Sequence, residues 1–547
     1  MERTPAGILR WLFDPQTGLR DRFGPRWLFL RALALIYFSA FYSLLRQVRG
    51  LIGPDGILPA GEYLEAVHRA FGTSRFWYAP TLYWVSSSNT FITALCWIGL
   101  IASIAALVNL WPRLTFFICL VCYLSFVAAA GDFSGYQSDG MLLEAGFLAL
   151  FFSPAGLRPG LGASSPPSRA SYLLLQWEWF RIYFESGLVK LLSGDPEWRH
   201  LTAMDQYYQN GPLPTWIGWY VQHLPHWFQV GSAGATLVME LAIVFLMFLP
   251  RRARFICFLI VTPWEIGVIL TANYTFLNYL VLSLGILLLD DRYLRRVLPA
   301  CLFRDKSAAV SSDPEPHESE EAEPPLSILT SSKPVRRPKL SHLQAIRLAV
   351  AAILLTLVAY VTTAELLLMP LPELPLPTSP IQLLDPFRIA NRYGLFAVMT
   401  RGRYEIEFQG SNDGQTWTPY PFRYKPQALN EAPRIYAPYQ PRFDWNLWFA
   451  SLGNWQQNNI VPLTEERLLS NSPDVLHLFA SNPFAAQPPK YIRAVLWQYW
   501  FTTMKEKHDT GDWWTRHLLG LYAPVLTRQP DGTFAVVQWP QPLPPHD

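Results

Sequence analysis

Residues 90–130 read TFITALCWIGLIASIAALVNLWPRLTFFICLVCYLSFVAAA and contain one charged side chain, Arg113. The stretch divides into two apolar runs, 90–110 and 114–130, on either side of that arginine. Each run is close to the ~20 residues that an α-helix needs to cross the hydrocarbon core of a bilayer. The stretch therefore predicts two transmembrane helices joined by a short basic turn.

Similar apolar segments occur along most of the chain. Seven more lie at 27–45, 141–152, 172–192, 231–249, 255–270, 274–289 and 348–368. The composition agrees, because 51% of the 547 residues are hydrophobic and only 16% are charged. We expect a polytopic α-helical membrane bundle of about nine crossings, surrounded by membrane lipid. The net charge of +3 is too small for a nucleic-acid partner.

Positive charges predict the orientation of this bundle, since short cytoplasmic loops carry most of the Lys and Arg. Arginines gather before residue 27 and then in alternate loops, at Arg3, Arg10, Arg20, Arg22, Arg26, Arg113, Arg158, Arg169, Arg251, Arg252, Arg254, Arg292, Arg295 and Arg296. The loops 131–140 and 271–273 carry none, although the longer loop 47–89 holds Arg49, Arg69 and Arg75. With an odd number of crossings, the C-terminal part is extracytoplasmic.

These patterns divide the chain into five parts. They are a cytoplasmic N-terminal arm (1–26), the transmembrane bundle (27–300), a cytoplasmic linker (301–342), a final transmembrane helix (343–370) and an extracytoplasmic domain (371–547). The linker contains DPEPHESEEAEPP, which is too polar and proline-rich to build a core, so we expect it to be disordered.

The last part predicts a mixed, β-rich domain. Tyr404, Ile406 and Phe408 alternate with polar residues, as in a half-buried strand, and the pair Asp413-Gly414 favours a tight hairpin turn. Short helices are expected at 463–469 and 474–480. None of the five cysteines lies after residue 301, so this domain has no internal disulfide.

Charged residues inside the apolar segments are the candidate functional residues of the bundle. Glu178, Arg181 and Glu185 lie on one face of one predicted helix, at spacings of three and four residues. An unpaired charge near mid-bilayer costs roughly 2.5–3.5 kcal/mol, so these side chains should face the bundle interior. Glu144, Glu240 and Glu265 add one carboxylate to each of three other segments. We expect an intramembrane polar network, which either fixes the helices together or forms a substrate or proton site.

Signatures of hydrolases, nucleotide-binding proteins and metalloproteases are absent, because the chain contains no G-x-S-x-G, G-x-x-x-x-G-K-[ST] or H-E-x-x-H sequence. Cys119 and Cys122 have the C-x-x-C spacing but lie inside an apolar run, and His223 and His226 lie beside aromatic residues. We interpret both pairs as packing or interfacial residues. No metal and no cofactor are expected.

Five separated stretches together resemble the lipase maturation factors. They are GLIGPDGILPA (50–60), YQSDGMLLEAGFLALFFSP (136–154), FESGLVKLLSGDPEWRHLTAMDQYYQNGPLPTWIGWY (184–220), APYQPRFDWNLWFA (437–450) and NPFAAQPPKYIRA (482–494). The resemblance implies a multi-pass protein, resident in the endoplasmic reticulum in animals, whose lumenal C-terminal domain helps secreted lipases to mature. The C-terminal domain here lacks cysteines, and the single glycosylation sequon of the chain, 273–275, adjoins the membrane. A bacterial inner membrane is therefore the favoured location.

On this interpretation the protein is a non-catalytic folding and assembly factor, and its partner is a secreted lipase or another exported client. The candidate client-binding residues are Tyr439, Arg442, Asp444, Trp445, Trp448 and Phe449. They include the residue types that dominate binding hot spots, although a Trp-rich run also occurs in domain cores.

A second function belongs to another class. The stretch YFESGLVKLLSGDPEW (183–198) resembles the membrane core of vitamin K-dependent carboxylases, in which a lysine takes part in quinone chemistry. Lys190 matches that lysine, but Leu191 stands where those enzymes carry a second one. A quinone-linked enzyme that uses Lys190 is the alternative function, and an end-of-helix lysine that reaches toward water is the structural interpretation.

Overall fold

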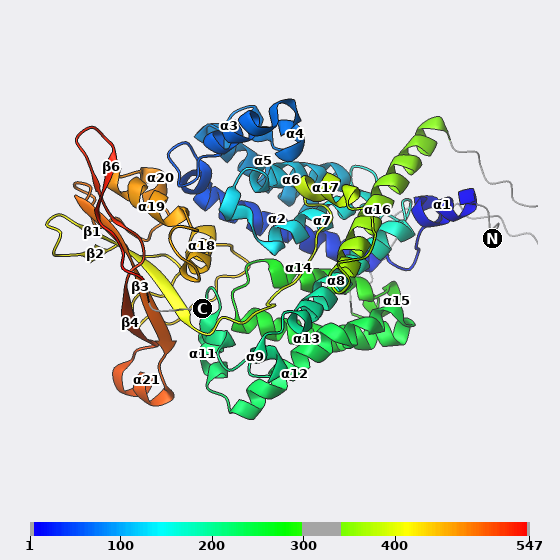
Figure 1. Ribbon diagram of the computed structural model, residues 1–547. Helices are drawn as coiled ribbons and strands as arrows, with labels where there is room; N and C mark the ends of the chain where they lie inside the picture. Colours follow the sequence, from blue (N-terminus) through cyan, green and yellow to red (C-terminus); the bar gives the residue numbers. More distant parts are fainter. Residues whose placement is uncertain (1–4, 298–340, 544–547) are drawn as a thin grey trace, which may run out of the picture.

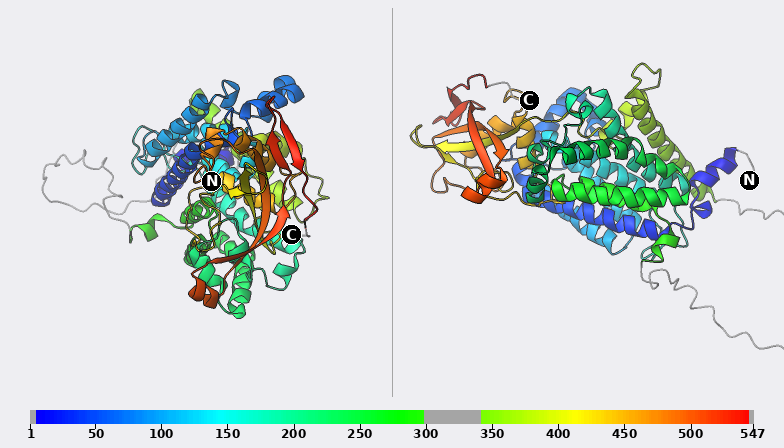
Figure 2. Two further views of the ribbon diagram at one scale, coloured as in Figure 1. Left: turned by 90° about the vertical axis from the view of Figure 1, so that its left-hand side faces the viewer. Right: turned by 90° about the horizontal axis from the view of Figure 1, so that it is seen from below.

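The computed structural model describes residues 5–297 and 341–543, which form a helical bundle with a sheet-containing domain at one end (Figure 1). Helix α1 (Pro5–Phe13) and the beginning of α16 (His342–Leu368) lie at the opposite end of the bundle, as the right-hand view of Figure 2 shows. The predicted linker at 301–342 falls, except for its last two residues, outside the described residues.

A helix lies at each of the nine predicted apolar segments. In chain order these are α2 (Phe23–Ile52), α5 (Asn89–Leu107), α6 (Pro112–Val127), α7 (Gln137–Phe152), α8 (Arg169–Leu192), α12 (His226–Leu241) with the 3-10 turn η5 (Ile243–Phe248), α13 (Arg251–Thr271), α14 (Leu277–Gly285) with η6 (Ile286–Leu288), and α16. Within the described residues, five are long and apolar enough to cross a membrane: α2, α5, α12 with η5, α13 and α16. The chain therefore contains a membrane domain.

Local sequence explains where several of these helices begin and how closely they pack. The hydroxyl of Ser168 accepts a hydrogen bond from the backbone N–H of Ser171 and caps α8, and Pro112 occupies the first turn of α6. Gly99 of α5 lies against the ring of Phe41 on α2, where an added Cβ would come within 2.3 Å of the ring. Glycine is therefore required for the close contact between α2 and α5.

Polar contacts gather the basic loops at one end of the bundle. The backbone N–H of Gly24 donates to Asp291 (2.7 Å), and Arg251 pairs with Asp290 (2.5 Å). At the same end, the Nε atom of Arg113 donates to the carbonyl of Ser153 (2.9 Å). The helices that these loops join therefore run alternately toward and away from the sheet-containing domain.

Shorter helices lie in the connecting segments. They are α3 (Ala60–Phe71), α4 (Arg75–Tyr78), α9 (Pro196–Arg199), α10 (Tyr207–Asn210), α11 (Trp216–Gln222), α15 (Asp291–Leu294) and α17 (Ser379–Leu384). The C-terminal domain adds α18 (Arg442–Ser451), α19 (Ile460–Leu469), α20 (Pro473–Leu476) and α21 (Met504–Thr510). Of these, α19 and α20 correspond to the two short helices that the sequence predicts.

The C-terminal domain is built on an antiparallel sheet. Its strands are β1 (Arg403–Ser411), β2 (Thr418–Pro419), β3 (Tyr491–Phe501), β4 (Trp514–Leu521), β5 (Val525–Arg528) and β6 (Phe534–Gln538). The order is β2-β1-β3-β5-β6, and β4 also pairs with β3. β1 pairs with β3 along its whole length, from Arg403 opposite Tyr499 to Ser411 opposite Tyr491. A mixed domain with a β core is therefore present.

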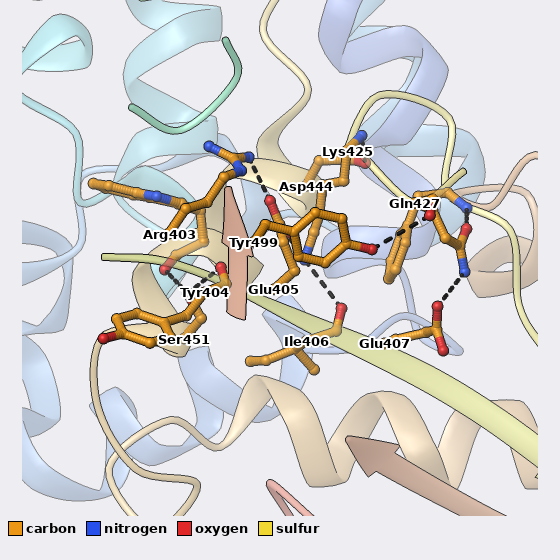
Figure 3. A network of polar contacts seen from close by, with 12 residues as sticks. Arg403, Tyr404, Glu405, Ile406, Glu407, Lys425, Gln427, Asp444, Ser451 and Tyr499 are labelled. Atoms are coloured by element: carbon orange, nitrogen blue, oxygen red, sulfur yellow. Dashed lines mark hydrogen bonds and ion pairs between the residues drawn. The ribbon is translucent and has the colours of Figure 1, made fainter. Parts of the chain in front are cut away.

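The prediction that β1 is half-buried was wrong, because all nine of its residues are buried. Figure 3 shows how its polar face is covered. Glu405 pairs with Arg403 and with Lys425 (2.8 Å), and Glu407 accepts a hydrogen bond from Gln427 (3.0 Å). Alternation of polar residues shows only that one face is polar. The loop after β2 supplies partners for each carboxylate, so the polar face is buried as well.

Candidate functional site

The chain between α16 and the sheet enters the helical bundle, which the sequence analysis did not anticipate. We call residues 389–399 the threaded segment; it leads from α17 through the bundle toward β1 (Figure 1). Its backbone N–H groups donate to side chains of the bundle: Asn391 to Glu144 (3.1 Å), Tyr393 to Glu185 (2.6 Å), Gly394 to Gln137 (3.0 Å), Leu395 to Ser186 (3.2 Å) and Met399 to Asp195 (2.8 Å). Irregular backbone is tolerated at membrane depth only where protein groups satisfy it in this way.

Arg181 is the centre of the first charged cluster. It is fully buried on α8, forms an ion pair with Glu144 of α7, and lies 3.9 Å from Glu185. Its Nη1 atom also donates to the carbonyl of Asn391 (2.6 Å), and the hydroxyl of Tyr393 donates to Glu144 (2.8 Å). The cluster therefore joins α7, α8 and the threaded segment.

Lys190 forms a second cluster at the end of α8. Its Nζ atom pairs with Glu240 of α12 (2.9 Å) and donates to the carbonyls of Leu395 (3.0 Å) and Ser186 (3.4 Å). These contacts use all three ammonium protons, and the side chain is 1% exposed. The pair holds α8, α12 and the threaded segment together.

The third cluster surrounds Glu265 of α13, which accepts hydrogen bonds from the hydroxyl of Tyr183 (2.6 Å) and the amide of Asn278 (2.6 Å). A cavity of about 70 Å³ separates it from Lys190 and Glu240. Pockets that hold small organic ligands usually measure roughly 300–1,000 Å³. The space beside Lys190 is therefore small for a quinone.

Glu178 stands apart from these contacts. It is fully buried on α8 but makes no ion pair with any described residue. Five of the six predicted intramembrane residues thus lie in three clusters, and the threaded segment links the two clusters that contain Arg181 and Lys190. Donors from this segment add to the ion pairs, because α7, α8, α12 and α13 bring six buried carboxylates but only two buried cations to the interior.

Arg442 connects the sheet-containing domain to the bundle. It lies fully buried at the beginning of α18 and makes a bidentate ion pair with Asp139 of α7, at 2.7 and 2.8 Å. The guanidinium also donates to the hydroxyl of Tyr123 (2.8 Å) and the carbonyl of Phe133 (2.6 Å), while its backbone N–H donates to Gln47 of α2 (2.8 Å). Arg442 therefore occupies the junction between the two domains.

Most of the other client-binding candidates are buried at the same junction. The indole of Trp448 donates to the carbonyl of Asn210 (3.0 Å), and Trp445 packs edge-to-face on Tyr136. Asp444 is 2% exposed, and burial raises its pKa to about 7. Tyr439 is half-buried and accepts a hydrogen bond from Gln47 (3.1 Å). Phe449 differs from these residues, because 44% of it is exposed.

A cavity of about 600 Å³ opens beside Phe449. Its walls come from the beginning of α7, the end of the threaded segment, α18 and α19. Aromatic and apolar side chains dominate, and the polar groups are few; the lining includes Tyr136, Tyr274, Phe396, Val398, Trp445, Trp448, Phe449, Asp132, Gln137, Asn446 and Asn458. This is a site that can hold an apolar segment of another molecule.

The cysteine and histidine pairs have no metal-binding arrangement in the described residues. Cys119 and Cys122 are buried free thiols, and no cluster of three or more His, Cys, Asp and Glu lies in the described ranges. The imidazole of His223 lies between the carbonyls of Trp219 (2.7 Å) and Thr502 (2.9 Å), and His226 pairs with Asp205 (2.9 Å).

Comparison with known proteins identifies both domains. Residues 24–296 match the lipase maturation factor transmembrane domain, and residues 389–524 match the lipase maturation factor C-terminal domain. The chain is 32% identical to lipase maturation factor 1 of Bos taurus over 96% of its own length and 94% of the relative's. The chain belongs to the lipase maturation factor family. Lipase maturation factor 2 of Gallus gallus is also 32% identical, over 92% of this chain and 81% of the relative.

Lipase maturation factor 2 of Homo sapiens is 31% identical over 92% of this chain and 82% of the relative. No solved structure matches the chain. In this member of the lipase maturation factor family, the matched C-terminal domain begins at residue 389, where the threaded segment begins. The family's C-terminal unit therefore includes the stretch that enters the bundle as well as the sheet and α18.

Proposed function

We propose that this protein is a membrane-bound maturation factor for secreted lipases or related exported proteins, and that it binds these clients through its C-terminal domain. The names of its relatives, which it matches over nearly its whole length, support the lipase role. The cavity beside Phe449 supports the location of the binding site, because most of its lining belongs to the family's C-terminal domain. A maturation factor holds its client without converting it, so no catalytic group is required.

The topology that this function needs is a bundle of nine crossings with the C-terminal domain outside the cytoplasm. The alternating direction of the nine helical segments supports it, and so does the collection of basic loops at the end opposite the sheet. The compartment stays a prediction, with a bacterial inner membrane favoured. Cysteines placed at Asp531 and Arg158, after Cys301→Ser, test the topology in intact cells. An impermeant maleimide should label only the first.

The client site consists of exposed apolar groups at the cavity mouth. Phe449 is 44% exposed and Val398 is 66% exposed, and both line the cavity. A partly folded lipase presents apolar segments that a native enzyme buries, and aromatic side chains in a recess offer such a segment a large contact area. The proposed contact is therefore an apolar client segment seated against Phe449.

The test is the specific activity of a secreted lipase, per mass of lipase protein, in host cells with and without the maturation factor. A fall in activity per milligram on deletion supports the proposal, and unchanged activity contradicts the lipase role. Phe449→Ala should then lower activity per milligram and weaken capture of the lipase at least tenfold, which corresponds to about 1.4 kcal/mol.

Trp500→Ala is the matched control. Trp500 is an exposed aromatic residue of the same domain, on β3, and does not line the cavity. Its replacement should leave lipase activity unchanged. Both variants should keep the thermal midpoint of the parent protein, because both side chains are partly in solvent. Equal effects of the two substitutions on lipase capture would contradict the proposed site.

A further inference from the structure

A second large cavity lies at the end of the bundle farthest from the sheet. It has a volume of about 650 Å³ and is bounded by the end of α1, the end of α7 and the first half of α16. Figures 1 and 2 show α1 and the beginning of α16 at this end of the bundle. Most of its wall is apolar, including Phe13, Phe151, Leu348 and Leu355. The volume lies within the range of roughly 300–1,000 Å³ that organic ligands occupy.

Two arginines stand on the wall of this apolar cavity. Arg113 comes from α6 and Arg347 from α16, and neither forms an ion pair with any residue that the structure describes. Arg113 uses its Nε atom to donate to the carbonyl of Ser153 (2.9 Å), and both of its terminal amino groups stay available to a ligand. Arg347 is exposed and makes no hydrogen bond within the described ranges. Two neighbouring cations that have no counterion among the described residues favour an anionic ligand.

The acidic group on the wall offsets only one of the two positive charges. Asp14 lines the cavity, but its Oδ1 atom accepts a hydrogen bond from the backbone N–H of Gln16 (2.9 Å), within its own turn. The other polar side chains of the lining are those of Gln16, Gln344, Ser164, Ser165 and Ser168. The wall thus combines a long apolar surface with a net positive charge at one end of the bundle.

From this combination we infer that the cavity binds one anionic glycerophospholipid of the surrounding bilayer. The phosphate lies against Arg113 and Arg347, since the planar guanidinium group matches phosphate geometry, and an acyl chain covers the apolar wall. The lipid also stabilises α16, which has few buried residues in its first half and exposes Leu343, Ile346, Val350 and Ile353. The site is separate from the proposed client site, which lies at the other end of the bundle.

Native mass spectrometry of the full chain in detergent tests this inference. The protein is titrated with dioleoyl phosphatidylglycerol and, separately, with dioleoyl phosphatidylcholine, which differs only in its headgroup. One equivalent of phosphatidylglycerol should bind at least tenfold more tightly. Arg347→Gln should reduce the affinity for phosphatidylglycerol about fivefold, the effect of one basic residue near an anionic lipid, and leave the affinity for phosphatidylcholine unchanged.

Arg252→Gln is the matched control, because Arg252 is an exposed arginine in the first turn of α13, at the same end of the bundle, but does not line the cavity. It should not alter either affinity. Ala351→Trp fills the cavity from α16 and should weaken both lipids. Thermal midpoints measured without added lipid identify any variant that has lost its fold. Arg347→Gln changes an exposed side chain and should keep the thermal midpoint of the parent.

Four outcomes would overturn the inference. They are equal affinity for the two lipids, an equal effect of Arg252→Gln and Arg347→Gln, complete competition by inorganic phosphate, and specific phosphatidylglycerol binding that appears only after deletion of residues 301–340. The second would indicate general surface charge, the third a free-phosphate site, and the fourth a cavity that the chain's own segment occupies.

Discussion

Replacing Arg442 with methionine should separate the sheet-containing domain from the helical bundle. The substitution removes both contacts to Asp139, so the Oδ2 atom of that carboxylate loses its bond to Nη1 while Oδ1 keeps the hydroxyl of Tyr123 (2.6 Å). Breaking one side of a buried ion pair costs about 3–5 kcal/mol, because the remaining charge stays buried. That loss is a large part of a typical stability of about 5–15 kcal/mol.

The assay is thermal unfolding of the full chain in nanodiscs, together with limited proteolysis of the C-terminal domain. Arg442→Met should lower the midpoint and expose the domain to protease. Adding Asp139→Asn should restore much of the loss, since no unpaired charge remains. Arg516→Met is the control, because Arg516 pairs with Glu407 at 3.3 Å while 27% of its side chain is exposed. That pair contributes about 1 kcal/mol or less.

Two results would refute this reasoning. One is a cost of Arg442→Met no larger than that of Arg516→Met, and the other is a double variant that loses the sum of the two single effects. Either result would mean that the pair with Asp139 does not hold the domains together. If Arg442→Met instead reduced lipase capture and left the unfolding midpoint unchanged, Arg442 would be a client-binding residue, as the sequence predicts.

Three further predictions concern the bundle and the sheet-containing domain. Lys190→Met should lower the unfolding midpoint, because it leaves Glu240 buried and unpaired. Adding Glu240→Leu should restore both the midpoint and lipase activity. A quinone-linked enzyme would stay inactive in the double variant. Burial raises the pKa of Asp444 to about 7, so its contribution to stability is present below pH 4 and is lost as the pH rises through 7. Relative to Asp444→Asn, the free energy of unfolding of the parent should fall by at most about 1.4 kcal/mol per pH unit. Denaturant unfolding between pH 5 and 8 measures this difference. Gly99→Ala should cost about 1–3 kcal/mol through overlap with Phe41, and an unchanged melting curve would contradict the close packing of α2 and α5.

Much of the fold follows from local patterns. Apolar runs of about the right length correspond to helices in all nine places, and the alternation at 404–409 and the turn at Asp413-Gly414 correspond to β1 and the hairpin that leads to β2. These features are readable because they depend on the period and length of apolar residues along a single element. The burial of β1 on both faces was not readable, since its polar partners Lys425 and Arg516 come from elsewhere in the chain.

The candidate sites also divide into features that the sequence shows and features that only the structure shows. The chemistry of Phe449 and its neighbours is evident in the run of aromatic residues, but only the structure separates the exposed Phe449 from the buried Trp445 and Trp448. An aromatic residue suits a core and a binding surface equally well, so composition cannot decide between the two. Likewise, an arginine suits a binding hot spot and a buried ion pair equally well. Only the structure places Arg442 in the ion pair that joins the two domains.

The sequence by itself determined that this chain enters a membrane, because no soluble fold can bury so many long apolar runs, and it determined the family through five ordered motifs. It also indicated that the intramembrane charges must face inward, since lipid cannot solvate them. Only the tertiary structure decided what neutralises them. The carboxylates outnumber the cations on those helices, and the donors to Glu144 and Glu185 come in part from the threaded segment; Tyr393 lies more than two hundred residues from Glu185 of α8. Contacts between such distant parts leave no periodic pattern in either segment, so they appear only when the chain is folded.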